Sequence, residues 1–170
     1  MPTTYVLGMN AGLYQGAAGE ADPASMSEVD NVRDVTLTLE AGEADITTRG
    51  NSGWRATAPT LRECTVEFQM VWRPGDPVFE AVKTAFLTAG TVALAVLDQK
   101  VAISGAQGPL GDFSITNFSR SEALEEAIVA DVTAKLARFY ARPSLGFATV
   151  ASQVIQHRER VRLAATKLRG

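Results

Sequence analysis

Apolar and polar residues alternate with a period of two along several stretches of the chain. Residues 32–40 read VRDVTLTLE, an order that places Arg33 on the same side as the apolar Val35 and Leu37. Such alternation predicts a β-strand with one buried face. An Ala-Gly pair at 41–42 predicts a turn. Further strands are expected at 5–15, 43–48 (the return strand of that turn), 61–73, 91–97, 100–104, 112–118 and 126–137.

In one segment the apolar residues recur with the period of a helix and not with a period of two. In residues 76–90 apolar side chains recur at helical spacing. Asp76 is suited to cap this helix, Pro77 to its first turn and Gly90 to its end. Many strands and one helix predict a mainly β fold, an antiparallel β-sandwich or open barrel with one flanking α-helix.

Composition and charge divide the chain into two parts. The 170 residues are 46% hydrophobic, which predicts a packed core. Residues 1–140 hold 10 basic and 18 acidic residues, a net charge of −8, and we expect them to form one domain. Residues 141–170 hold six basic residues and one acid, a net charge of +5. They are expected to form a basic arm, either helical or disordered.

The residue types needed for catalysis or metal binding do not come together in the sequence. Cys64 is the single cysteine and lies on the apolar side of a strand, so we expect no internal disulfide and an inert thiol. His157 is the single histidine and lies in the arm. We therefore expect no enzyme activity, no metal and no cofactor. With no basic leader and no apolar run of about 18 residues, we also expect no signal peptide and no membrane contact.

The polar sides of four expected strands are rich in threonine and acids. Together they hold seven acids and three bases, a net charge of −4. This face is either the solvated side of an ordinary antiparallel sheet or a wall that faces a water-filled channel. Its acids are Asp34, Glu40, Glu43, Asp45, Glu63, Glu67 and Asp131.

A loop at 49–60 carries a large aromatic residue on a polar, glycine-rich segment. Trp54 is costly to leave in water, so it either packs back on its own subunit or contacts another molecule. The candidate contact residues of this loop are Arg49, Gly50, Asn51, Gly53, Trp54 and Arg55.

Four segments occur in the order found in one viral family. GMNAGLYQG (8–16), the continuous run from VDNVRDVTLTLE to VEFQMVW (29–72), DPVFEAVKTAFLTAG (76–90) and FSRSEALEEAIVADVTAKL (118–136) resemble the major tail tube protein of long-tailed bacteriophages. The resemblance covers most of residues 5–138 and leaves 141–170 uncovered. The tube protein of type VI secretion is similar in fold.

The resemblance implies a structural protein of a virion tail, made in the cytoplasm of a bacterial host. It implies hexameric rings that stack into a hollow tube, through which DNA passes without specific binding. The implied partners are other copies of the chain, the tape measure protein, the tail terminator and tail-tip proteins. The acidic face would then line the lumen. The loop at 49–60 would reach into the adjacent ring, with Trp54 as its anchor.

Three other readings stay open at the level of the sequence. A secretion-system tube would share the fold and the acidic face. A β-sandwich ligand-binding module would need an aromatic-lined cleft, but most aromatic residues, such as Phe68 and Phe79, fall on expected core faces. An enzyme is disfavoured by the missing catalytic groups.

Overall fold

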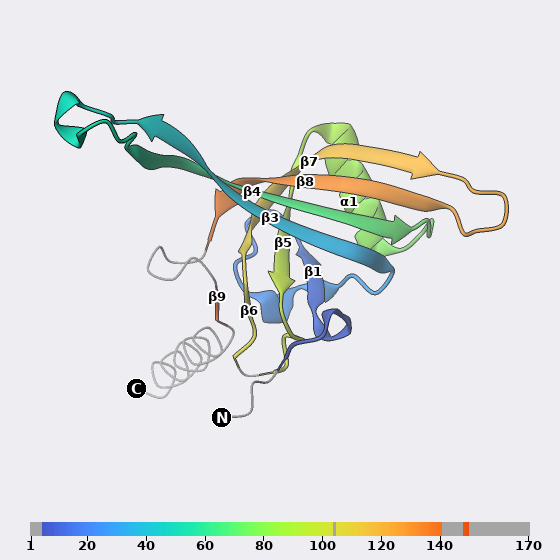
Figure 1. Ribbon diagram of the computed structural model, residues 1–170. Coiled ribbons are helices and arrows are strands. Elements are labelled where there is room, and N and C mark those ends of the chain that lie inside the picture. Colours follow the sequence, from blue (N-terminus) through green and yellow to red (C-terminus); the bar gives the residue numbers. More distant parts are fainter. Residues whose placement is uncertain (1–4, 104, 141–147, 150–170) are drawn as a thin grey trace, which may run out of the picture.

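The computed structural model describes residues 5–103, 105–140 and 148–149. These residues form a mainly β protein with one α-helix (Figure 1). The elements, in chain order, are the 3-10 helix η1 (Gly8–Asn10), β1 (Gly12–Gly16), η2 (Pro23–Ser25), β2 (Ser27–Glu28), β3 (Val32–Asp45), η3 (Arg49–Asn51), β4 (Thr57–Val71), α1 (Pro77–Thr88), β5 (Thr91–Leu97), β6 (Gln107–Gly108), β7 (Leu110–Ser121), β8 (Val129–Phe139) and β9 (Ala148–Thr149).

Seven strands form one antiparallel sheet in the order β2-β1-β5-β7-β8-β4-β3. Its two edge strands, β2 and β3, are consecutive in the chain and are joined by residues 29–31 alone. The sheet must therefore curl until its edges nearly meet. Two hydrogen bonds hold this link, from Val29 N to Leu13 O at 2.8 Å and from Val71 N to Asn31 O at 2.9 Å. The expected mainly β fold is confirmed; it consists of this curved sheet and a separate two-stranded sheet of β6 and β9.

The concave side of the sheet encloses the main core. Side chains from β1, β4, β5, β7 and β8 meet there, and α1 covers them. Phe79 of α1 and Phe113 of β7 are both fully buried. The predicted cap of the helix is confirmed, because Asp76 Oδ1 accepts hydrogen bonds from the backbone N–H groups of Val78 and Phe79, both at 2.9 Å. The left-handed residue that ends the helix is Ala89, one position before the expected glycine.

A second, smaller core lies against β1 and β5 and includes Tyr14, Met26 and Ala95. The Tyr14 hydroxyl accepts a hydrogen bond from Val101 N at 3.1 Å and holds the following segment over this core. The strand expected at 100–104 is wrong, because the described residues there form a turn.

The hairpin was expected to turn at 41–42. It turns further along the chain, through the 11 residues 46–56. β3 continues unbroken through Asp45, and its partner β4 begins at Thr57. The register shifts between Ala41 and Glu43, so the glycine at 42 marks a bulge and not a turn. A Cβ atom on Gly42 would lie 2.5 Å from Thr60 Oγ1, so a larger residue there would require the Thr60 side chain to move.

A second bulge corrects the expected side of Arg33. Arg33 pairs with Gln69 and Thr36 pairs with Glu67, so β3 has one extra residue between the two pairs. Asp34 takes up the irregularity with a left-handed φ of 48°. The bulge moves Arg33 to the polar side of the sheet and away from the apolar residues with which the alternation groups it.

Two further observations concern the ends of the chain and membranes. Of residues 141–170, the structure describes Ala148–Thr149, which pair with β6; the expected basic arm otherwise lies outside the described residues. No helix within the described part of the chain is long and apolar enough to cross a membrane.

Candidate assembly surfaces

Strands β7, β8, β4 and β3 form a four-stranded wall whose outer face is polar. The strand registers place threonines, serines, amides and charged residues side by side across the wall. We call this face the polar wall. It consists of Arg33, Thr36, Thr38, Glu40, Glu63, Thr65, Glu67, Gln69, Ser114, Asn117, Ser119, Asp131, Thr133 and Lys135.

Acids outnumber bases on the polar wall, with four acids and two bases giving a net charge of −2. The acids Glu40 and Glu63 lie directly opposite one another, a like-charge pair that weakens strand pairing. Asp131 accepts a hydrogen bond from Gln69 Nε2 at 3.0 Å. The charged side chains of the wall are all exposed, so the wall is hydrated and mildly acidic.

Four of the seven acids expected on this face, Glu40, Glu63, Glu67 and Asp131, are brought together there. The other three are not. Glu43 and Asp45 follow Glu40 in the same strand without a turn, so alternation places them on the other side of β3. Asp34 lies in the bulge.

The polar positions of β7 were not singled out from the sequence. Ser114 and Asn117 both face the polar wall, although their odd spacing contradicts simple alternation. A bulge between Ile115 and Asn117 accounts for the shift. The run of serine, threonine and asparagine in this segment was the signal available.

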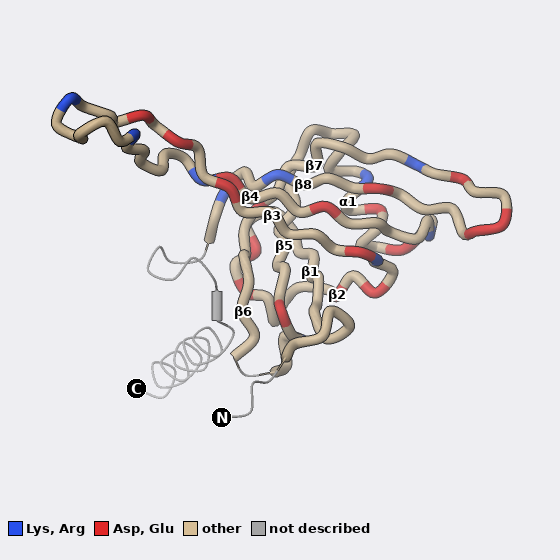
Figure 2. The backbone as a smooth tube through the Cα atoms, viewed as in Figure 1, with Lys and Arg blue, Asp and Glu red and all other residues tan. Residues whose placement is uncertain are grey.

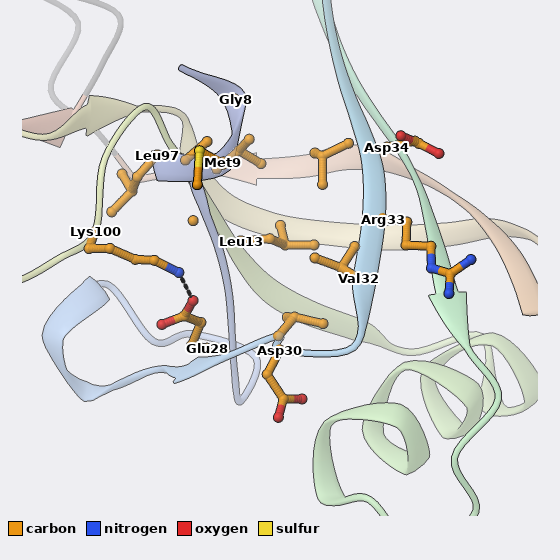
Figure 3. A pocket seen from close by; sticks show the side chains of 15 residues that line it. Gly8, Met9, Leu13, Glu28, Asp30, Val32, Arg33, Asp34, Leu97 and Lys100 are labelled. Carbon is orange, nitrogen blue, oxygen red and sulfur yellow. Dashed lines mark hydrogen bonds and ion pairs between the residues drawn. The ribbon is translucent and has the colours of Figure 1, made fainter. Parts of the chain in front are cut away.

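A cavity of about 460 Å³ opens where β3, one edge strand of the sheet, approaches β1, the strand next to the other edge. Asp34 lines it, and Leu13 and Leu97 supply apolar surface (Figure 3). Lys100 pairs with Glu28 beside it, and this hydrogen bond raises the pKa of Lys100. The lysine is therefore held as a cation, which makes it unsuited to act as a base or nucleophile.

The polar wall has two free backbone edges within the described chain. β3 pairs with β4 on one side and has no strand on its other side. β7 loses its neighbour β5 at the pair Thr91–Ser114, so residues 115–121 pair with β8 alone. Unpaired edges of this length attract further strands.

The β3–β4 hairpin projects beyond the body and ends in an ordered tip at 46–56 (Figure 1). Thr47 Oγ1 accepts a hydrogen bond from Ala56 N at 2.9 Å. Hydrogen bonds from the side chain and backbone of Thr47 lower the pKa of Asp45, which also pairs with Arg55 at 3.5 Å. These contacts hold the tip in one shape without any help from the core.

Trp54 is 80% exposed at this tip. The alternative in which the indole packs back on its own subunit is therefore wrong for the isolated chain. Ser52 and Gly53 next to it take left-handed backbone conformations, with φ of 52° and 85°. The turn thus presents the indole to solvent and not to the core of its own subunit.

A curved antiparallel sheet with a polar wall, two free edges and a projecting hairpin defines a β protein suited to associate with copies of itself. The chain belongs to the phage tail tube protein family, whose model matches residues 13–137. It is accordingly a structural component of a viral tail and not an enzyme. The family expected from the sequence is confirmed.

Solved structures of the same fold come from two kinds of particle. A tail of an empty gene transfer agent particle, refined with C6 symmetry, matches with a TM-score of 0.63 at 16% identity over 77% of this chain and 93% of that chain. The virion of a native gene transfer agent matches with a TM-score of 0.58 at 16% identity, over 79% and 98% of the two chains. The SPP1 tail tube matches with a TM-score of 0.61 at 13% identity, over 81% and 77%. The comparison with curated protein sequences gave no match.

Proposed function

We propose that six copies of this chain join edge to edge into a ring, with β3 of one copy beside β7 of the next, and that rings stack into a tube. The four wall strands alternate in direction, so rotating a copy about the ring axis places its β7 antiparallel to β3 of its neighbour. The two free edges are therefore compatible in direction. This is the observation that carries the proposal.

Ring closure removes the exposed edges, since each copy donates one edge and receives another. The C6 symmetry of the similar gene transfer agent tail supports six copies. The match to a phage family supports a viral tail over a secretion-system tube. The tape measure protein, tail terminator and tail-tip proteins are the further partners of such a tube.

In this ring the polar wall lines the lumen, and DNA passes along it during genome delivery. A basic lining would bind phosphates by releasing counterions and would hold the DNA in place. The acids of the wall, such as Glu63 and Glu67, instead repel the polyanion and keep water between them. Asp34 is absent from this lining because it lies in a bulge of β3, and Glu43 and Asp45 are absent because the expected turn at 41–42 does not occur.

The tip of the β3–β4 hairpin makes the contact between rings. The wall strands run between the two faces of the ring, so a hairpin that extends them beyond the body enters the next ring. Trp54 is buried there, as aromatic anchors are at interfaces. The other tip residues of this contact are Arg49, Gly50, Asn51, Gly53 and Arg55.

Disulfide trapping tests the edge pairing. In a Cys64→Ala background, Thr38→Cys on β3 is combined with Asn117→Cys or with Ser119→Cys on β7. Oxidation is expected to give a ladder of linked subunits up to the hexamer, because cysteines on paired strands meet the short Cα separation of a disulfide.

The matched control combines Thr38→Cys with Thr133→Cys on β8, which the proposal separates from the neighbour's β3 by a whole strand. Electron microscopy of the unmodified protein shows in parallel whether rings and tubes form. Rings without a ladder from either β7 position, or an equal ladder from Thr133, would refute the edge pairing. Dispersed monomers at high concentration would refute the assembly itself.

A further inference from the structure

The wall strands end in two hairpin turns at opposite ends of the sheet. Asp45 pairs with Thr57 beside the β3–β4 tip, whereas Val129 pairs with both Val71 and Ser121 at the far end. Residues 122–128, which connect β7 to β8, therefore lie at the end of the wall that is farthest from the tip. Figure 1 shows the two turns projecting in opposite directions.

The two turns carry opposite charges. The tip at 46–56 contains two arginines and no acid, and the β7–β8 turn at 122–128 contains three glutamates and no base. Figure 2 shows the acidic residues gathered on that turn. Among the described ion pairs, Glu122 is matched by Arg120, and Arg55 is matched by Asp45, which directly precedes the tip. Glu125 and Glu126 have no cationic partner in these pairs, and Arg49 has no acidic partner.

Each turn also presents large apolar side chains to solvent, and one in each turn is the most exposed. Trp54 is 80% exposed and Leu124 is 102% exposed. The β7–β8 turn is held in shape from its base, because the Arg120 guanidinium lies 5.0 Å from the ring centre of Trp72 and pairs with Glu122. Both turns are therefore formed in the single chain and ready to contact another molecule.

We infer that the β3–β4 tip docks on the β7–β8 turn of a second copy of this chain in the next ring. The inference rests on the proposed function, which places the two turns on opposite faces of each ring. Head-to-tail stacking then brings the basic tip of one ring to the acidic turn of the next, with Trp54 and Leu124 in the contact.

The same charges give the tube a direction. Rings stacked tip to tip would oppose positive charges, and rings stacked turn to turn would oppose negative charges. Only the head-to-tail arrangement places unlike charges together, so the chain encodes one polarity of growth. Repulsion between like charges disfavours the two wrong arrangements. This effect is larger than the affinity that the unlike charges add to the head-to-tail arrangement.

Charge exchange tests the docking. The tip variant is Arg49→Glu with Arg55→Glu, the turn variant is Glu125→Lys with Glu126→Lys, and the exchanged chain carries all four changes. We expect single rings but few tubes from the tip variant and from the turn variant, and tubes again from the exchanged chain. A loss of about two-fold at each exposed charge contact, repeated around a six-membered ring, weakens ring addition roughly 60-fold.

Light scattering and electron microscopy measure tube length, and circular dichroism of every variant checks that the subunit is folded. Lys83→Glu, on α1 and away from both turns, is the matched control and is expected to give tubes of normal length. Normal tubes from the turn variant would overturn the docking site, as would an exchanged chain that forms rings but no tubes. In both cases the rings of the proposed function would remain; an unmodified chain that forms no rings would refute that function instead.

Discussion

Trp54→Ala tests whether Trp54 stabilises the folded subunit or the contact between rings. The indole is 80% exposed, so of roughly 200 Å² of side-chain surface only about 40 Å² is buried in the single chain. At about 25 cal/mol per Å², its removal should lower the free energy of unfolding by about 1 kcal/mol. Burial of the remaining 160 Å² or so between rings would contribute about 4 kcal/mol per subunit to stacking.

The other tryptophan provides the control. Trp72 packs edge-to-face on Phe79 with ring centres 4.9 Å apart, so Trp72→Ala should destabilise the subunit by about 3 kcal/mol or more. In a Trp72→Phe background Trp54 is the sole indole. Its fluorescence should be that of a solvated indole in the subunit and shift to shorter wavelength as tubes form.

Urea denaturation measures the first effect, and sedimentation of tubes measures the second. A folded Trp54→Ala variant that still forms full-length tubes would refute the assignment of Trp54 as the inter-ring anchor. An emission maximum that stays unchanged during tube formation would refute it independently.

Two further variants, one double and one single, test the lumen and the helix. Glu63→Lys with Glu67→Lys should change subunit stability by no more than about 0.5 kcal/mol, since both positions are exposed, yet should slow DNA release from particles; release as fast as from particles with Glu63→Gln and Glu67→Gln would contradict the proposed role of charge. Asp76→Ala removes both capping hydrogen bonds of α1 and should cost about 1–2 kcal/mol in urea denaturation, whereas Asp76→Asn should retain most of that stability. Equal stability of the Ala and Asn variants would show that the cap contributes little.

The parts of the fold that local chemistry determines could be predicted from the sequence. The helix at 76–90 has a cap, a proline in its first turn and an apolar stripe, and each of these acts within a few residues. The main strands of the wall follow from alternation for the same reason. The threonine content, four acids and the negative sign of the polar wall's charge were therefore predictable, whereas the net charge of −2 is half the expected −4.

The bulges were not predictable, because nothing in the local sequence requires them. Asp34 adopts a left-handed conformation that is usual for glycine, and only the pairing of β3 with β4 reveals it. Pro59 argues against a strand, yet it lies within β4 where that strand has a single neighbour. Gly42 looks like a turn residue and is a point of close approach. In β3 one such bulge places Arg33, which precedes it, on the same side as Thr36, which follows it, against simple alternation.

The part of the hairpin beyond the body has a mechanical consequence. β8 accompanies β4 no further than the pair Thr65–Lys135, so residues 57–64 of β4 are paired with β3 alone. A two-stranded ribbon with a bulge at Gly42 bends and twists far more easily than a curved sheet packed on a core. Each ring would thus be a stiff disc linked to the next by slender elastic arms. If the proposed rings form, such a tail would bend at the two-stranded hairpins between rings, while each ring would keep its own diameter.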